Sequence, residues 1–188
     1  MKAKLIYVVG PSGAGKDSLL NWLRAHLAAD LPVAWARRTI NRPAALDGEL
    51  HESVATDEFN QLLSAQQFAM HWAANDHLYG IRHAELRSLA DPSWVFVNGS
   101  RPHIPQAAQL YPGMTVLHIT ADKEVLRERL LNRGRESSQA IENRLDRMPK
   151  LQVPSGCQLI EIHNHERLET TGHQLLEALK SLPDWPTR

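Results

Sequence analysis

Short runs of apolar residues alternate along the chain with longer segments in which apolar residues recur every three or four positions. The short runs predict buried strands, and the periodic segments predict amphipathic helices. The predicted strands cover residues 5–9, 33–36, 68–74, 78–81, 94–98, 114–120 and 158–163. The predicted helices cover residues 17–31, 56–65, 85–90, 104–111, 123–133, 137–148 and 167–182. Since strands and helices mostly alternate, we expect an α/β fold with a mostly parallel sheet and helices on both faces.

The 188 residues are expected to form one domain with three parts. Residues 37–56 are polar and rich in turn-forming residues, so we expect an insertion over the functional site, ending where Thr56 caps a helix. The expected parts are a core of about residues 1–36, 94–130 and 149–188, a substrate-binding subdomain of about residues 37–93, and a lid of about residues 131–148.

A glycine-rich loop joins the first predicted strand to the first predicted helix. Its sequence, Gly10-Pro-Ser-Gly-Ala-Gly-Lys16, fits the phosphate-binding pattern G-x-x-x-x-G-K. Glycines let the backbone adopt positive φ, so successive N–H groups surround an anion at the helix N-terminus, while Lys16 reaches the β- and γ-phosphates. The predicted nucleoside triphosphate site comprises Gly10, Pro11, Ser12, Gly13, Ala14, Gly15, Lys16, Asp17 and Ser18. The alternative is a strand-to-helix turn that binds no ligand.

Asp17 stands where the phosphate-binding pattern has serine or threonine, whose hydroxyl is a ligand of Mg²⁺. A bare carboxylate about 5 Å from a phosphate oxygen would cost about 3 kcal/mol at an effective dielectric constant of about 20. A cation between the two groups reverses the sign, and carboxylates are ordinary ligands of Mg²⁺. We therefore predict that Asp17 binds Mg²⁺, directly or through water. The alternative is that it only stabilises the helix dipole.

Arginines follow the second predicted strand at Arg37, Arg38 and Arg42. In a doubly wound sheet the ligand crevice lies at the carboxyl ends of the strands. Because guanidinium groups bind phosphate bidentately, this cluster predicts a second phosphorylated ligand, with Arg42 as the preferred candidate and Arg38 beside it. The alternative is a solvated basic loop.

A second set of arginines flanks the helix break at Gly134: Arg129, Arg133, Arg135, Arg144 and Arg147. Such a segment predicts a mobile lid that brings positive charge over a transferring phosphoryl group. We expect Arg133 and Arg144 to neutralise the charge that develops during transfer. The alternative is an exposed charged face without a catalytic role.

The predicted strand 94–98 ends in Asn98, where many ATP-using proteins have a metal-binding aspartate. A strong general base is therefore not expected there. This absence favours a phosphate as acceptor, because a phosphate is already anionic and needs alignment and charge neutralisation more than deprotonation. Asn98, Ser100 and Arg101 are predicted to donate hydrogen bonds to a substrate, and a structural strand-end turn is the alternative.

Composition and charge limit the binding partners, metal sites and cellular location that we expect for this protein. The 21 basic and 21 acidic side chains balance, so neither a nucleic-acid nor a membrane partner is expected, and no apolar run approaches membrane-spanning length. The single cysteine, Cys157, excludes an internal disulfide, and we expect a cytoplasmic enzyme. The 10 histidines show no metal-binding spacing, so they and the tryptophans, including Trp72, are expected to serve packing or surface roles.

Together these segments resemble the guanylate kinases over nearly the whole chain, with Leu78-Tyr79-Gly80 and Arg129-Leu-Leu-Asn-Arg133-Gly134 as further points of likeness. The chain is more similar to the ribose 1,5-bisphosphate phosphokinases of phosphonate utilisation. That likeness rests on the segments Gly15-Lys16-Asp17-Ser18, Val97-Asn98-Gly99-Ser100-Arg101 and Asn132-Arg133-Gly134-Arg135-Glu136. It implies a P-loop fold like that of nucleoside monophosphate kinases. It also implies phosphorylation of ribose 1,5-bisphosphate by ATP with Mg²⁺, which gives 5-phosphoribosyl 1-diphosphate.

The chain departs from guanylate kinases at Leu50, where those enzymes carry a tyrosine that contacts the nucleotide phosphate. A guanine-nucleotide site of the usual kind is therefore not expected, and Glu49 and His51 are candidates for binding ribose hydroxyls instead. Tyr79 matches the family tyrosine and is a candidate ligand of the acceptor phosphate. A guanylate kinase and a non-catalytic interaction module remain the alternatives, and the residues leave a monomer and a homodimer equally open.

Overall fold

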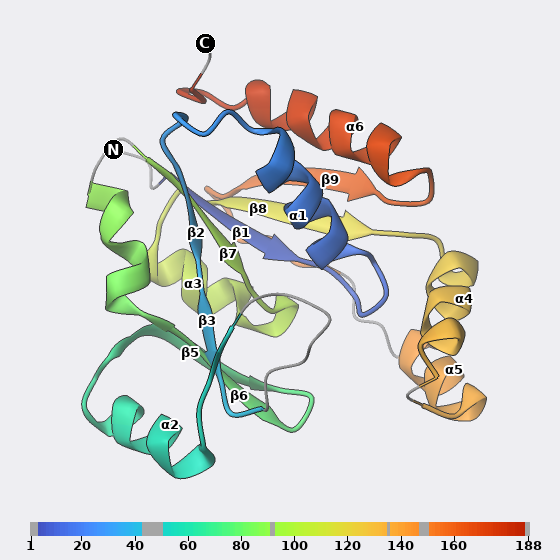
Figure 1. Cartoon of the computed structure of the whole chain (residues 1–188), viewed down its shortest axis with the longest axis horizontal. Coiled ribbons are helices and arrows are strands. Elements are labelled where there is room, and N and C mark those ends of the chain that lie inside the picture. Colours follow the sequence, from blue (N-terminus) through green and yellow to red (C-terminus); the bar gives the residue numbers. More distant parts are fainter. Residues whose placement is uncertain (1–3, 43–50, 91–92, 135, 147–150, 187–188) are drawn as a thin grey trace. The chain divides into compact units, whose positions relative to one another are not determined.

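The computed structural model describes residues 4–42, 51–90, 93–134, 136–146 and 151–186, and these form an α/β fold (Figure 1). Hydrogen bonds join five strands in the order β2-β7-β1-β8-β9. These strands are β1 (Leu5–Val9), β2 (Val33–Ala36), β7 (Trp94–Asn98), β8 (Thr115–Thr120) and β9 (Gln158–His163). A second sheet of four strands has the order β4-β3-β6-β5. Its strands are β3 (Arg38–Ile40), β4 (Glu52–Ser53), β5 (Phe68–Ala74) and β6 (His77–Arg82).

Helices connect most of these strands. The α-helices are α1 (Lys16–His26), α2 (Thr56–Ser64), α3 (Ile104–Leu110), α4 (Lys123–Arg133), α5 (Ser138–Asp146) and α6 (Leu168–Lys180). Two 3₁₀ segments, η1 (His83–Ala90) and η2 (Arg101–His103), precede β7 and α3. The expected α/β class with a mostly parallel sheet is confirmed, since β2 pairs in parallel with β7, and β8 and β9 run in the same direction in Figure 1. No helix in the described ranges is both long enough and apolar enough to cross a membrane.

The chain divides into two compact units. The first contains residues 1–7, 32–115 and 154–158, and the second contains residues 8–31, 116–153 and 159–188. The division expected from the sequence, into a core, a subdomain and a lid, stays a prediction.

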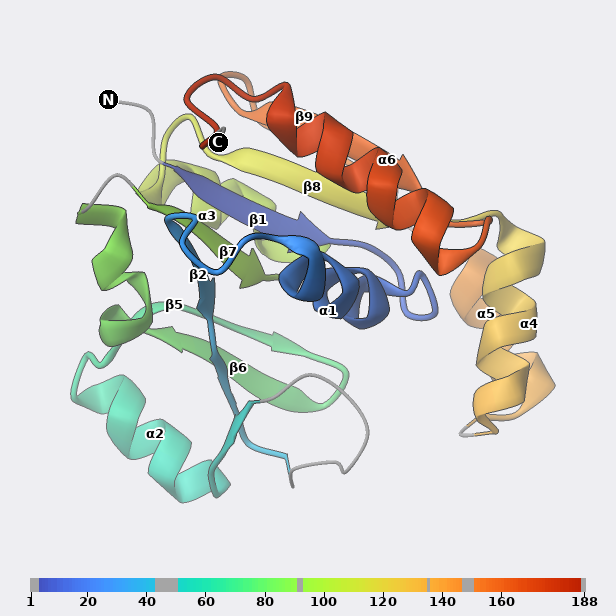
Figure 2. The same cartoon turned by 45° about the horizontal axis from the view of Figure 1, so that its top comes forward.

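The first unit carries the antiparallel hairpin of β5 and β6 (Figure 2), and β3 pairs antiparallel with β6. Asn75 and Asp76 connect the two strands with φ of 48° and 60°, the left-handed conformation that tight hairpin turns require. On one face of this sheet Phe59 of α2 stacks on Phe68 at 4.6 Å. Gly80 makes that packing possible, because a Cβ there would lie 2.3 Å from the Phe68 ring.

The second unit is built around α1, α6 and the pair of α4 and α5. The indole Nε1 of Trp22 on α1 donates to Glu169 Oε2 of α6 at 2.5 Å, and Gly172 leaves room for the indole ring. Helices α4 and α5 are joined by the ion pair of Arg127 with Glu142 and by a second pair between α4 and the end of α5. Gly134 ends α4 with φ of 62°, which confirms the break expected there.

The structure corrects the expected secondary structure at three places. The sequence did not predict the strands Arg38–Ile40 and Glu52–Ser53, of which the first pairs antiparallel with β6 and parallel with the second. Helix α1 ends at His26 rather than residue 31, since Leu27 has the extended ψ of 141°. The N-cap of α2 is Ala55, and Thr56 instead accepts a hydrogen bond from Asn41 Nδ2 at 3.1 Å. The pairing of β3 with β6 and the contact of Thr56 with Asn41 are tertiary interactions, which local sequence patterns do not include.

Candidate functional site

The glycine-rich loop follows β1 and holds its shape through close backbone contacts. A Cβ on Gly10 would lie 2.0 Å from the carbonyl oxygen of Ile119, so only glycine fits at this turn. Gly13 and Gly15 have φ of 87° and 81°, and Gly15 is the N-cap of α1. The Lys16 ammonium donates to the Gly10 carbonyl at 3.0 Å and thereby lies beside the loop that it is predicted to serve.

Two side chains from distant elements hold the loop in place. Asn164 follows β9, is 4% exposed, and donates from Nδ2 to the Ala14 carbonyl at 2.8 Å. Its backbone N–H donates to the Thr120 carbonyl at 2.7 Å, which fixes Asn164 to the end of β8. Arg129 of α4 donates to the Gly13 carbonyl at 3.4 Å. Sequence motifs did not identify Asn164 as a residue that holds the loop, because its partner Ala14 lies 150 residues away in the chain.

A cavity of about 360 Å³ opens beside this loop. Among its lining residues are Gly13, Gly15, Ser18, Arg129, Arg133 and Asn164. Arg129 and Arg133 lie one helical turn apart on α4, so both line the cavity from the same face of the helix. The arrangement joins anion-binding backbone to two cationic side chains, which is what a polyphosphate needs.

The two arginines predicted to neutralise charge from the lid, Arg133 and Arg144, lie in different surroundings. Arg133 lines the cavity, whereas Arg144 of α5 forms an ion pair with Glu136 at 2.6 Å. The exposed fraction of the Arg144 side chain is 42%, so the guanidinium also meets solvent. Arg135 and Arg147 lie outside the described residues.

The metal prediction concerns the first turn of α1. Asp17 and Ser18 are both exposed there, directly after the phosphate-binding loop. In the part of the chain that the structure describes, no group of three or more His, Cys, Asp and Glu side chains forms a metal site. Mg²⁺ does not need such a group, because it binds one or two carboxylates and completes its shell with phosphate oxygens and water. The exposed Asp17 carboxylate therefore fits Mg²⁺ that arrives with a nucleotide.

Two residues predicted to bind the acceptor substrate, Arg38 and Tyr79, lie in the first unit on β3 and β6. The Arg38 guanidinium carbon is 5.3 Å from the centre of the Tyr79 ring, a cation–π distance. Tyr79 is 6% exposed and stacks on Trp72 at 5.7 Å with an angle of 2° between the rings. The structure thus brings together Arg38 and Tyr79, two of the predicted ligands of an acceptor phosphate.

Arg42 and His51 lie where β3 and β4 meet the chain between them. The Arg42 carbonyl accepts a hydrogen bond from Ser53 Oγ at 2.7 Å, and His51 Nε2 lies 3.4 Å from the same oxygen. Within the described ranges, the buried Arg42 Nε has no hydrogen-bond partner. Glu49, the other predicted ligand of ribose hydroxyls, lies outside the described residues, as does Leu50.

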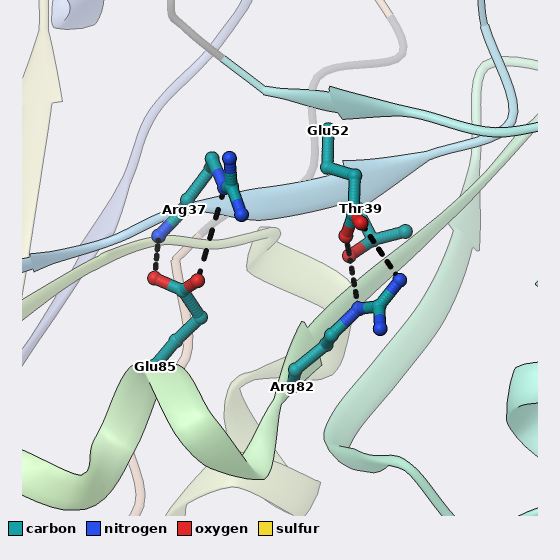
Figure 3. Close-up of polar contacts among 5 residues, drawn as sticks. All are labelled: Arg37, Thr39, Glu52, Arg82 and Glu85. Atoms are coloured by element: carbon teal, nitrogen blue, oxygen red, sulfur yellow. Dashed lines mark hydrogen bonds and ion pairs between the residues drawn. The ribbon is translucent and has the colours of Figure 1, made fainter.

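Figure 3 shows that other arginines of this region are held by carboxylates. Arg82 Nη2 donates to Glu52 Oε1 at 2.8 Å, and Glu52 also accepts a hydrogen bond from Thr39 Oγ1 at 2.7 Å. Arg37 pairs with Glu85 of η1, which accepts from the Arg37 backbone N–H at 2.9 Å. Arg37 is thus paired with Glu85, and Arg38 and Arg42 stay the predicted phosphate ligands of the arginine cluster.

The chain after β7 is shaped by Tyr7 of β1. A Cβ on Gly99 would lie 2.1 Å from the Tyr7 ring, so this glycine permits the close approach. The Tyr7 hydroxyl accepts the Ser100 backbone N–H at 3.2 Å and lies 2.9 Å from Nδ1 of His103. Burial raises the pKa of Tyr7 far above its usual value, so the hydroxyl keeps its proton.

Asn98 and Arg101, two further predicted donors, flank this turn. Asn98 is 4% exposed, and loss of solvation lowers the pKa of the half-buried Arg101. Neither Tyr7 nor His103 was predicted from the sequence, since an isolated tyrosine in a strand and an isolated histidine carry no spacing signal.

Comparison with known proteins places the chain among relatives. The sequence profile of the guanylate kinase family matches residues 2–182. The chain is 43% identical over 177 residues to a protein of Janthinobacterium sp. named ribose 1,5-bisphosphate phosphokinase PhnN, covering 94% of this chain and 39% of that protein. It is 41% identical over 178 residues to a protein of the same name from Thiobacillus denitrificans, covering 95% of this chain and 93% of that protein. The chain therefore spans less than half of the first relative and nearly all of the second.

One solved structure supports the same fold. The guanylate kinase from Anaplasma phagocytophilum superposes with a TM-score of 0.57 at 15% sequence identity, covering 96% of this chain and 85% of that one. At this identity the likeness concerns the fold alone.

Proposed function

Because the chain belongs to the guanylate kinase family, and within it to the ribose 1,5-bisphosphate phosphokinases, we propose that it phosphorylates ribose 1,5-bisphosphate with ATP. The product is 5-phosphoribosyl 1-diphosphate. The observation that carries this proposal is the 41% identity to a phosphokinase of that name over 93% of its length. Membership of the guanylate kinase family suggests the reaction class, which is transfer of a phosphoryl group to a phosphate.

The chemistry of the proposed acceptor agrees with the residues after β7. An oxygen of the 1-phosphate attacks the γ-phosphorus, and the bond from that phosphorus to the β–γ bridging oxygen breaks to release ADP. The attacking oxygen is already anionic, so no proton has to be removed. Asn98 at the end of β7 carries an amide rather than a carboxylate, and this suits an acceptor that needs no base.

On this proposal the residues that bind ATP, the phosphoryl donor, lie in the second unit. The backbone of the glycine-rich loop and Lys16 hold the β- and γ-phosphates, and Arg133 lies at the same cavity. Asp17 would hold Mg²⁺, which supplies charge neutralisation to the nucleotide. In the first unit, Arg38, Arg42 and Tyr79 hold the acceptor phosphate, while Ser100 and Arg101 hold more of the substrate.

A coupled assay that measures ADP release tests the function. The purified protein is supplied with ATP and Mg²⁺ and with either ribose 1,5-bisphosphate or GMP as the acceptor. We expect turnover with the sugar bisphosphate and formation of 5-phosphoribosyl 1-diphosphate. Turnover of GMP alone would establish a guanylate kinase instead, and failure of ATP to bind in calorimetry would leave a non-catalytic module.

Arg133→Ala is expected to lower kcat about 100-fold while the KM for ATP changes little. The reason is that a cation at the transferring group matters most when charge develops in the transition state. Steady-state kinetics with Arg87→Ala, an exposed arginine of η1, as the matched control would measure the effect. Equal losses in kcat and in ATP affinity would contradict the transition-state role.

Asp17→Ala is expected to raise the Mg²⁺ concentration needed for half-maximal activity about tenfold, because the metal loses a carboxylate ligand. Asp57→Ala is the matched control, since Asp57 is also an acidic residue in the first turn of a helix. If both variants keep the wild-type Mg²⁺ dependence, Asp17 serves only the helix dipole.

A further inference from the structure

A second cavity lies within the first unit, along the edge of the four-stranded sheet. Its volume is about 620 Å³, within the range of about 300–1,000 Å³ typical of small-molecule sites. Strand β5 forms one side, and the chain from Ser100 through η2 and α3 forms the other. The polar residues of the lining are His71, Ser100, His103 and Gln106. Among the described lining residues there is no Lys, Arg, Asp or Glu.

This lining favours one class of ligand. Cationic side chains, which strengthen the binding of phosphate groups, are absent from the described lining, whereas neutral hydroxyl groups are well served by imidazole, amide and hydroxyl groups. Trp72, which is 9% exposed, adds an aromatic wall, and Met70 and Pro102 add further apolar surface. An apolar wall combined with a few polar groups suits a sugar ring, which has both C–H faces and hydroxyl edges.

The hydrogen bonds around His103 bear on which of its two ring nitrogens carries the proton. The Tyr7 hydroxyl oxygen accepts the Ser100 N–H, and its own proton can be donated to Nδ1 of His103, 2.9 Å away. In that arrangement His103 is a neutral imidazole whose proton is on Nε2, and this tautomer is part of the proposal. Burial and the nearby His71 lower the pKa of His103, which keeps the ring neutral. In this tautomer Nδ1 accepts from Tyr7, and His103, which lines the cavity, has an Nε2–H donor for a ligand.

Neighbouring aromatic rings connect this cavity to the predicted phosphate ligands within the same unit, with Trp72 tilted against His103 and stacked on Tyr79. Trp72 lies 5.2 Å from the His103 ring and 5.7 Å from the Tyr79 ring, and Arg38 lies over Tyr79. A ligand whose phosphate is held by Arg38 and Tyr79 therefore has the Trp72 wall next to it. Ser100, predicted from the sequence to bind substrate, lines the same cavity.

We propose that this cavity binds the ribose ring of the acceptor, with His103 Nε2–H donating to a ring hydroxyl and Trp72 packing against the sugar. Tyr7 is a positioning residue that sets the tautomer of His103. The proposal rests on the proposed function, because it takes the sugar phosphate as the acceptor. It adds the specificity-determining residues: the aromatic wall and the fixed donor select a sugar.

The first test is kinetic. His103→Ala is expected to raise the KM for ribose 1,5-bisphosphate about tenfold, the effect of losing one hydrogen bond, with kcat and the KM for ATP within twofold of wild type. His103→Gln, which retains an N–H donor, should recover part of the loss. His83→Ala, an exposed histidine of η1, is the matched control and should behave as wild type.

A second acceptor separates the ring from the 5-phosphate. Ribose 1-phosphate has the same ring hydroxyls at C2 and C3 but no 5-phosphate, and its affinity can be measured as an acceptor or as a competitive inhibitor. If His103 binds the ring, His103→Ala weakens both sugar phosphates by the same factor. A loss seen only with the bisphosphate would assign His103 to the 5-phosphate and overturn the proposal.

The third measurement needs no turnover. Two-bond ¹H–¹⁵N correlation spectra report histidine tautomers, and wild-type His103 should be the Nε2–H form near neutral pH. Tyr7→Phe should give a mixture of tautomers, because the hydroxyl that fixes Nδ1 is gone. An Nδ1–H form in the wild type would overturn the proposal. Wild-type inactivity with the sugar bisphosphate would instead refute the proposed function, whereas an active wild type with an unchanged KM in His103→Ala would refute this inference alone.

Discussion

Lys16→Met lowers kcat for phosphoryl transfer by about 1,000-fold, the loss expected when one preorganised charge is removed from a reacting phosphate. Methionine keeps a flexible stem of similar length and removes the ammonium group, so packing near the loop is preserved. In the structure this ammonium donates to the carbonyls of Gly10 and Pro11 at 3.0 and 3.4 Å. The charge is therefore held at the loop before any nucleotide binds. Single-turnover kinetics with saturating ATP would measure the chemical step directly.

Lys180→Met is the matched control for this prediction. Lys180 lies on α6 in an exposed pair with Glu177, at 2.7 Å, and a surface pair of this kind contributes little. Its rate should equal that of wild type. A Lys16→Met protein that folds normally and turns over within tenfold of wild type would refute the role of Lys16 in transfer.

Gly10→Ala lowers the free energy of unfolding by about 3 kcal/mol, because overpacking against rigid backbone is costly. The added Cβ would lie 2.0 Å from the Ile119 carbonyl oxygen, and a main-chain atom of β8 cannot rotate away as a side chain can. Either β8 or the loop must shift, so nucleotide affinity should fall with stability. Urea unfolding followed by circular dichroism would give the free energy, and calorimetry would give the affinity for ATP.

Gly134→Ala provides the comparison for that result. Gly134 has a φ of 62°, but a Cβ there would meet nothing within 4 Å. Only the left-handed backbone opposes alanine at this position, at a cost of about 1–2 kcal/mol. If Gly10→Ala were no more destabilising than Gly134→Ala, the close approach to Ile119 would not constrain the loop.

Part of the fold and of the site follows from local sequence. The strand Leu5–Val9, the loop after it and the start of α1 were all predicted, because glycine spacing and an apolar run act over a few neighbouring residues. The helix Lys123–Arg133 and its end at Gly134 were predicted for the same reason. Phosphate chemistry was also accessible from sequence, since the loop binds anions largely through its own backbone.

The sequence by itself therefore determined the class of fold, the phosphate-binding loop and the family likeness. Only the tertiary structure decided which distant side chains support them. Asn164 holds the loop across 150 residues, and Tyr7 acts on His103 across 96. It also distinguished Arg37, which pairs with Glu85, from Arg38, which lies over Tyr79. Such roles depend on pairing between segments that are far apart in the chain, and local patterns of apolar and polar residues carry no record of that pairing.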